Sequence, residues 1–372
     1  MISFDRRSLQ HFNWALLALI AVIVAIGITN LFSATQAVAP PGYGVTSEFR
    51  RQLVALGLGT LGLIIAIAVD YRRLERGAPF LYAIALASIA ATVLWGVEIR
   101  GNKSWIVIGS VSIQPAEFAK LGLIVMMARY FHRHPPGDMR RLLDLVAPGL
   151  ILLAPVGMIV LQRDTGVAVL TAAVGASFFF FVSLPWRTWA FVVVIALAGA
   201  VGAWEFGLKP YQRERVMAFV NPGSGDRLGS DYQAIQSRIA VGSGGLTGQG
   251  WLEGPQNRGQ FLPTQHSDFA FSVLAEEWGF AGAATFIALY VSLLLWGLAI
   301  AANSKDGFGA MLAVGVVSML LWPAVINIGM VLGLAPVIGV PLPLVSYGGS
   351  QILTNLVGLG LLLNVSMRRY MF

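Results

Sequence analysis

The sequence predicts an all-α, polytopic membrane protein with about ten transmembrane helices. Hydrophobic residues make up 56% of the 372 positions and charged residues only 12%, whereas a soluble domain is about half apolar and a quarter charged. The apolar residues gather in segments long enough to cross a hydrocarbon core of about 30 Å as helices. The chain has no cysteine, which excludes a disulfide framework and any cysteine-ligated metal site.

The apolar runs define ten expected spans within a single membrane domain, residues 1–372. They lie at 14–34, 52–69, 79–97, 115–131, 145–162, 166–183, 187–205, 268–301, 309–333 and 348–367. The first run follows Arg6 and Arg7 and resembles a signal peptide, but its length of about 18 apolar residues and the many later spans favour a retained helix. The eighth is long enough to tilt or to begin outside the bilayer.

The Lys and Arg residues of alternate loops predict the orientation of these helices. One side of the membrane receives Arg6, Arg7, Arg72, Arg73, Arg76, Arg129, Arg133, Arg140, Arg141, Arg187, Lys305, Arg368 and Arg369. The short loops of the other side receive Arg50, Arg51, Arg100, Lys103 and Arg163. The richer side is cytoplasmic, so we expect both termini in the cytoplasm and the long loop 206–267 outside it. The net charge of +7 then reflects orientation rather than nucleic-acid binding.

Loop 206–267, between the seventh and eighth spans, is too long to be a mere connector. Its segment from Asp231 to Val241 has the apolar spacing of a short interfacial helix. The glycine-rich SGGLTGQG that follows predicts turns or a close approach of the backbone to a ligand. At the loop entrance, Arg213 and Arg215 could hold a phosphate or anchor in lipid headgroups. Candidate substrate-binding residues further along the loop are Gln236, Ser243 and His266.

The stretch FLPTQHSDFAFSVLAEEWGF, residues 261–280, places three carboxylates in and beside the eighth span. Asp268 stands at the start of the span, where water can reach it. Asp268 could be a catalytic carboxylate or simply an acid that caps the helix. Glu276 and Glu277 lie deeper, and the helical period directs them away from Asp268. We expect one of them to meet a cation from another span, because hydrocarbon penalises unpaired charge.

Three further stretches carry polar candidates. Glu117 and Lys120 lie at i,i+3 spacing on one helix face, either as a structural ion pair or on a polar cavity. Asp164, in the hairpin QRDTG, could contact a ligand or only form a surface turn. The link LAPVIGVPLPLVSYGGSQ, residues 334–351, is rich in proline and glycine. It indicates broken backbone at membrane depth, with Ser346 and Tyr347 as candidates.

Together these stretches resemble the SEDS family, the RodA/FtsW group of cell-wall polymerases. The motifs that carry the resemblance are NKSWIVIGSVSIQPAEFAK, QRDTG, YQRERVMAFVNP, GSDYQAIQSRIAVGSGGLTGQG, FLPTQHSDFAF and NIGMVLGLAPVIGVPLPLVSYGGSQ. Met330 and residues 338–343 are closer to the elongation (RodA) branch than to the division (FtsW) branch. The resemblance implies a fold similar to GT-C-type glycosyltransferases and a multi-pass protein of the bacterial inner membrane.

The resemblance also implies a reaction, the polymerisation of lipid II into β-1,4-linked glycan strands on the extracytoplasmic face. Asp268 matches the family's essential acid and is assigned as the general base, and Glu117 and Lys120 match its cavity-lining pair. A divalent cation (Mg²⁺ or Mn²⁺) is implied as cofactor, although no motif demonstrates a metal site. The implied partners are a class B penicillin-binding protein and other proteins of the elongation complex. From composition alone, a lipid II flippase or transporter remains the main competing class, followed by a scaffold that only activates a partner.

Overall fold

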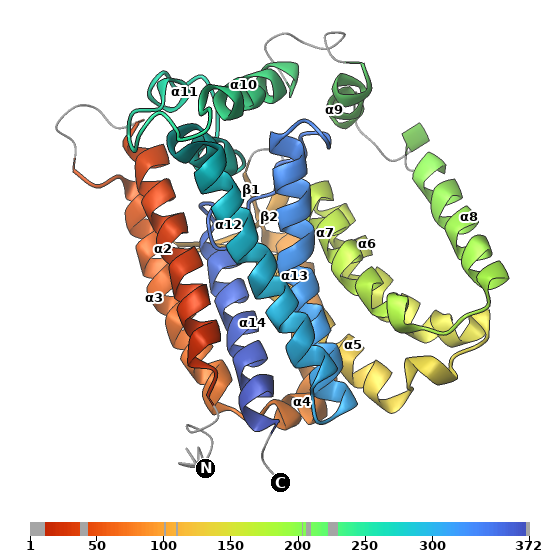
Figure 1. The fold of residues 1–372 in the computed structure, drawn as a ribbon. Helices are drawn as coiled ribbons and strands as arrows, with labels where there is room; N and C mark the ends of the chain where they lie inside the picture. The colour runs from red at the N-terminus through yellow and green to blue at the C-terminus, as the bar shows by residue number, and fades with distance from the viewer. Residues whose placement is uncertain are drawn as a thin grey trace.

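The protein is a bundle of long helices in the computed structural model, which describes residues 12–37, 44–99, 102–108, 111–202, 204–205, 210–221 and 230–369 (Figure 1). The first half contains α2 (Trp14–Gln36), α3 (Ser47–Ala68), α4 (Tyr71–Trp95), β1 (Val97–Ile99), β2 (Asn102–Ile108), β3 (Val111–Ile113), α5 (Pro115–Arg133), η1 (Pro136–Asp138), η2 (Leu142–Leu145), α6 (Val146–Leu161), α7 (Thr165–Ala176) and η3 (Ser177–Phe181). The second half contains α8 (Trp186–Gly202), α9 (Pro210–Val220), α10 (Ser230–Ser243), α11 (Pro255–Arg258), α12 (Ala270–Ala302), α13 (Gly307–Val331) and α14 (Gly349–Arg368).

Seven stretches among the described residues are long and apolar enough to cross a membrane. They are α2, α3, α4, the stretch Leu142–Leu161, α12, α13 and α14. The other three predicted spans coincide with α5, with α7 and η3, and with α8, which are more polar or shorter. The prediction of an all-helical polytopic membrane protein is therefore confirmed.

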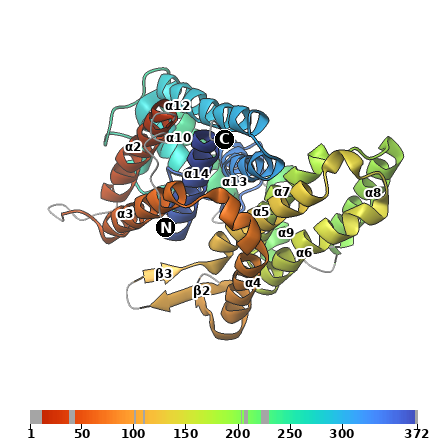
Figure 2. The ribbon, with the colours of Figure 1, turned by 90° about the horizontal axis from the view of Figure 1, so that it is seen from below.

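Helices α13 and α14 form the centre of the bundle, with α2, α3, α4, α5 and α12 around them (Figure 2). Helix α14 packs closely along α3. A Cβ on Gly360 would lie 2.6 Å from the Leu63 carbonyl oxygen, so the absent side chain permits this close approach. The start of α2 and the end of α14 lie at one end of the bundle, and α10 and α11 cover the other end (Figure 1). Helix α8 stands apart from the central helices in both views.

A small antiparallel sheet, in the order β1-β2-β3, precedes α5. Ile106 pairs with Ile113 and Val107 with Ser112. The apolar pattern predicts only a short loop here, and the difference has a physical reason. The stretch NKSWIVI is rich in β-branched and aromatic residues but needs its neighbours on both sides before its backbone is hydrogen-bonded.

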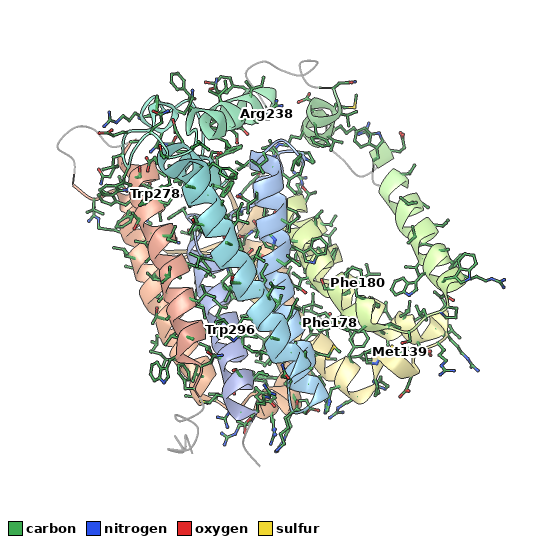
Figure 3. All side chains as sticks on the ribbon, in the orientation of Figure 1. Met139, Phe178, Phe180, Arg238, Trp278 and Trp296 are labelled. Atoms are coloured by element: carbon green, nitrogen blue, oxygen red, sulfur yellow. The ribbon has the colours of Figure 1, made fainter. Side chains whose placement is uncertain are left out.

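Helix α12 is interrupted near its start, and the glycine-rich loop fills the interruption. Gly279 has φ +65°, a conformation that favours glycine. The free backbone groups bond the loop: Gln249 and Gly250 donate to the carbonyls of Glu276 and Glu277 at 3.0 and 3.1 Å. The half-exposed Trp278 lies immediately before the break (Figure 3). The close approach predicted for SGGLTGQG is therefore made to α12 itself.

Candidate functional site

The link between α13 and α14, residues 332–348, is non-helical, and most of its second half, residues 340–348, is buried by protein. Helix α2 lies directly against it, because a Cβ on Gly27 would be 2.3 Å from the Leu344 carbonyl oxygen. From α3, the Gln52 amide donates to the Ser346 carbonyl at 3.3 Å and accepts from the Gly348 N–H at 3.1 Å. The buried Ser346 hydroxyl accepts from the Leu342 N–H at 2.9 Å. Broken backbone is thus tolerated at this depth because protein groups satisfy it.

Asp268 lies where this link meets the turn that precedes α12. The carboxylate is only half-buried, and its Oδ2 is 3.3 Å from the position that a Cβ on Gly339 would take. The same turn carries His266, whose carbonyl accepts from the Tyr347 N–H at 2.9 Å. The rings of His266 and Tyr347 meet edge to face with centroids 5.7 Å apart. The structure therefore brings together four predicted residues, Asp268, His266, Ser346 and Tyr347.

Both segments that meet at Asp268 contain a non-glycine residue in the left-handed region. Thr264 has φ +58° and Leu344 has φ +69°. Such backbone is costly, particularly for a β-branched residue, and strain of this kind gathers at functional sites. The Thr264 carbonyl accepts the Asp268 N–H at 3.1 Å, so the strained residue directly supports the acid.

A second group of predicted residues lies at the start of α5 and α7. The Lys120 ammonium is 2.9 Å from both carboxylate oxygens of Glu117, and both side chains are buried. Asp164 caps α7 and accepts from the Gln114 amide at 2.8 Å. Burial raises the pKa of the Asp164 carboxyl, and the nearby Glu117 charge acts in the same direction while Lys120 opposes it. Lys120 is thus the cation that directly pairs with Glu117.

The 332–348 link and the first residues of α14 connect the two groups. The Gln114 N–H donates to the Ser350 hydroxyl at 2.9 Å. On the α7 side, a Cβ on Gly166 would be 3.3 Å from the Ile338 carbonyl oxygen, and Ile338 precedes the glycine that faces Asp268. Asp164, Glu117 and Lys120 therefore belong to the scaffold around the link.

Glu276 and Glu277 have a different role from the predicted contact with a cation of another span. Glu276 accepts the backbone N–H groups of Gln256 and Asn257 at 2.7 and 3.1 Å, at the start of α11. Glu277 accepts from the Ser33 hydroxyl and, at 2.9 Å, from the Asn257 amide. No ion pair to either glutamate is found among the described side chains. That expectation was wrong because neutral donors of the loop and of α2 bond both carboxylates in place of a cation.

Four other predicted residues lie on the elements of the long loop. Arg213, on α9, donates to the Glu205 carbonyl at 2.7 Å, which ties α9 back to the end of α8. Arg215 shares α9, and Gln236 is half-buried on α10. The Ser243 hydroxyl donates to the Ala240 carbonyl at 2.8 Å within α10. None of these contacts reaches Asp268, so substrate binding by these residues stays a prediction.

Sequence reasoning missed the amides that hold the link. Asn327 is a rare polar residue in the apolar helix α13, which is itself a signal of a buried contact. Gln52 follows Arg50 and Arg51 at the polar start of α3, where it gives no such signal. Ser237 was also missed: its hydroxyl is 2.9 Å from both the Ser272 hydroxyl and the Val331 carbonyl, which joins α10 to α12 and α13. Arg238, the next residue of α10, packs against Gly333 at the start of the link (Figure 3).

The described residues do not form a protein cage for a metal ion. Within the ranges that the structure covers, no three His, Cys, Asp or Glu side chains come together. Mg²⁺ is often bound by only one or two carboxylates together with substrate phosphates. The carboxylate of Asp268 could therefore hold a divalent cation only together with phosphate oxygens of a substrate.

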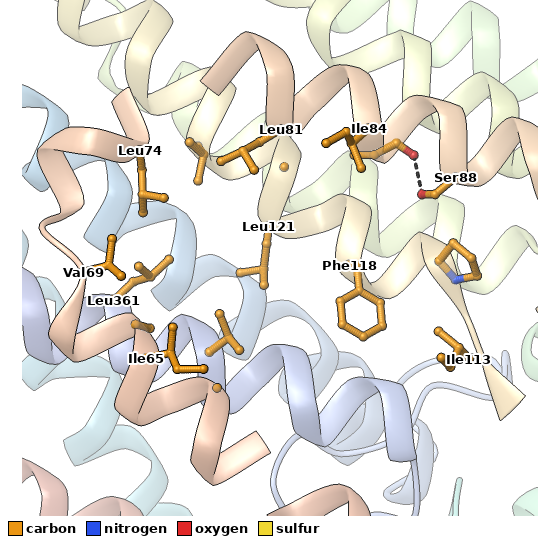
Figure 4. Close-up of a pocket in the computed structure, with 17 residues that line it drawn as sticks. Ile65, Val69, Leu74, Leu81, Ile84, Ser88, Ile113, Phe118, Leu121 and Leu361 are labelled. Atoms are coloured by element: carbon orange, nitrogen blue, oxygen red, sulfur yellow. Dashed lines mark hydrogen bonds between the residues drawn. The ribbon is translucent and has the colours of Figure 1, made fainter. Parts of the chain in front are cut away.

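An apolar cavity of about 650 Å³ lies between α3, α4, α5 and α14 (Figure 4). Its wall is aliphatic along most of its length, with Ser88 as a rare polar side chain, and that hydroxyl donates to the Ala85 carbonyl at 2.7 Å. One end reaches Ile113, Pro115 and Phe118, at the start of the helix that carries Glu117 and Lys120. Such a cavity suits a hydrocarbon chain rather than a polar solute.

Comparison with known proteins agrees with this arrangement. The family model of the FtsW/RodA/SpoVE cell cycle proteins matches residues 11–371. Peptidoglycan glycosyltransferase MrdB of Escherichia coli K12 is 38% identical over 323 residues, 86% of each chain. Peptidoglycan glycosyltransferase RodA of Treponema pallidum is 31% identical over 98% of this chain and 99% of its own.

Solved structures show the same fold over nearly the whole chain. A peptidoglycan synthase complex that coordinates polymerization and crosslinking contains a chain with a TM-score of 0.80 and 36% identity, covering 97% of this chain and 99% of that one. The rod shape determining protein RodA of Thermus thermophilus gives a TM-score of 0.70 at 33% identity, covering 97% and 98%. This chain therefore belongs to the SEDS (FtsW/RodA/SpoVE) family and is a RodA-like peptidoglycan glycosyltransferase within it.

Proposed function

We propose that Asp268 is the general base of an inverting glycosyl transfer between two lipid II molecules. The acceptor sugar hydroxyl loses its proton as it attacks the anomeric carbon of the donor, and a carboxylate within hydrogen-bond reach takes that proton. Polyprenyl diphosphate leaves from the opposite face, which converts an α linkage into a β-1,4 bond. The product is one glycan strand lengthened by a disaccharide unit.

The observation that carries this proposal is the accessibility of Asp268 relative to the neighbouring acids. Glu117, Asp164, Glu276 and Glu277 are buried. Asp268 is half-buried and lies between two strained backbone segments. A base must meet both substrate and water, and that combination favours Asp268 over the buried carboxylates.

The surrounding features supply places for the rest of the substrate. The apolar cavity is suited to the polyprenyl chain of a donor, and one end reaches the first turn of α5, the helix that carries Glu117 and Lys120. Arg213 and Arg215 remain proposed ligands of the diphosphate, since guanidinium groups offer donors in a fixed geometry. A divalent cation, if used, would be held by Asp268 together with the diphosphate oxygens. We infer an extracytoplasmic site, with both termini in the cytoplasm.

The partner that we propose is a class B penicillin-binding protein, which would crosslink the strands that this chain makes. The support is the similarity to a chain of a complex described as coordinating polymerization and crosslinking. We also propose other proteins of the elongation complex as partners, because the chain is similar to the RodA branch of the family.

The test is polymerisation of purified lipid II in detergent by the wild-type protein and Asp268→Asn. Each is assayed with a partner that lacks a glycosyltransferase domain. We expect the variant to lose activity by a factor of about 10²–10⁴, as for removal of a general base. Asp138→Asn, an exposed acid at the opposite end of the bundle, should retain full activity, and thermal melting should show that both variants fold.

Two outcomes would contradict the proposal. Equal product from the wild-type protein and a folded Asp268→Asn variant would remove the base assignment. Absence of polymer from the wild-type protein, together with movement of lipid II across reconstituted vesicles, would favour a flippase.

A further inference from the structure

Asn327, near the end of α13, joins the two segments that meet at the acid. Its side chain is fully buried, and its Nδ2 donates to the Asp268 carbonyl at 2.7 Å and to the Val340 carbonyl at 2.6 Å. One amide group therefore holds the backbone at Asp268 and the backbone at Val340, the residue after Gly339, at the same time.

The polar side chain is not explained by stability alone. The Asn327 Oδ1 is buried without a hydrogen-bond partner among the described residues, and such an atom carries a desolvation cost. An apolar side chain would avoid that cost, but it would leave the carbonyls of Asp268 and Val340 without this donor. What the asparagine adds is the pair of bonds to the two segments.

The Val340 bond bears directly on the carboxylate of Asp268. Gly339, adjacent to Val340, has φ +69° and faces Asp268 Oδ2. Displacement of residues 339–340 would therefore move the wall against which the carboxylate rests. A second hydrogen bond, from the Tyr347 N–H to the His266 carbonyl, restricts the movement of the same two segments at their other end.

We propose that Asn327 is a positioning residue, which holds the Asp268 carboxylate at the angle and depth required for proton transfer. The proposal rests on the proposed function of Asp268 and assigns no contact between Asn327 and substrate. Loss of the amide should therefore lower turnover and leave substrate binding nearly unchanged, because a displacement of about 1 Å at a reacting group can cost on the order of 100-fold in rate.

The chain offers a matched control in Asn364, on α14 at the opposite end of the bundle. It is equally buried, and its Nδ2 also bridges backbone carbonyls, those of Ala66 and Ile67 at 2.6 and 3.0 Å and that of Val69. Replacement of either asparagine removes the same kind of contact, but only one of them is next to the acid.

The experiment measures kcat, KM for lipid II and thermal melting for the complex of this protein with its crosslinking partner. The variants are Asn327→Leu, Asn364→Leu, Gly339→Ala and Asp268→Asn. Leucine has the branched shape of asparagine, but its methyl groups are bulkier and it leaves the two carbonyls without this donor, so thermal melting of each variant measures the structural cost. We expect kcat of Asn327→Leu to fall about 10- to 100-fold, while KM stays within about twofold, the pattern of an interaction that acts in the transition state.

The controls separate positioning from stability. Asn364→Leu should melt at a lower temperature with near wild-type kcat, and Gly339→Ala should lower kcat because its methyl group meets Oδ2. The inference is overturned if folded Asn327→Leu has wild-type kcat while Asp268→Asn is inactive, or if Asn364→Leu loses kcat equally. Activity of Asp268→Asn would instead overturn the proposed function, and this inference with it.

Discussion

Lys120 is the residue on which the buried charge of Glu117 depends. It is 2% exposed and bonds Glu117, and its charge also acts on Asp164. Lys120→Met should therefore destabilise the protein by about 3–5 kcal/mol, because it leaves a buried carboxylate without its cation. Thermal unfolding in detergent measures this effect.

The double variant Glu117→Gln/Lys120→Met provides the comparison for that experiment. It removes both charges and should melt closer to the wild-type protein than Lys120→Met does, since a buried pair replaced as a whole is often nearly neutral. Equal melting of the single and double variants would show that the pair is not coupled. Arg133→Met, whose partner Glu75 lies 3.7 Å away near the surface, should cost at most about 1 kcal/mol.

At the scale of elements, the packing of the glycine-rich loop against the interrupted part of α12 should depend on Gly248. This residue has φ +87°, and a Cβ there would lie 2.1 Å from the Glu277 carbonyl oxygen. Gly248→Ala should therefore cost on the order of 2–4 kcal/mol through strain and overlap. We expect a lower melting temperature and faster trypsin cleavage after the exposed Arg258.

Gly242→Ala is the matched control within the same region. Gly242 lies in α10 with open space where a Cβ would stand, so alanine should be neutral or slightly stabilising there. If Gly248→Ala melts as Gly242→Ala does, the loop is not docked on α12 in the way described.

The elements also show how far the sequence could be read. The long helices could be predicted because a helix in lipid satisfies its backbone within its own segment, so a local apolar run is enough. The sheet before α5 and the break at Gly279 could not, since each depends on hydrogen bonds to another segment. In the site, Asp268 was predictable as a rare acid beside an apolar span. The amides of Asn327 and Gln52 act on partners 59 and 294 residues away, a pairing that one sequence does not reveal.

At the scale of the whole molecule, the absence of cysteine makes the proposed orientation directly testable. Gly137, in η1, and Leu246, in the glycine-rich loop, are both exposed. Helix α10, which precedes Leu246, covers one end of the bundle (Figure 1), and Met139, two residues after Gly137, lies toward the other end (Figure 3). The positive-inside distribution of Lys and Arg predicts that Gly137 is cytoplasmic and Leu246 is outside. The reagent is a maleimide that cannot cross the inner membrane, applied to intact cells whose outer membrane has been made permeable. It should label Leu246→Cys at once, and it should label Gly137→Cys only after the inner membrane is opened. The wild-type chain has no cysteine to react, so it reports the background. The reverse labelling pattern would place Asp268 on the cytoplasmic side, where a polymerase of extracytoplasmic glycan could not act.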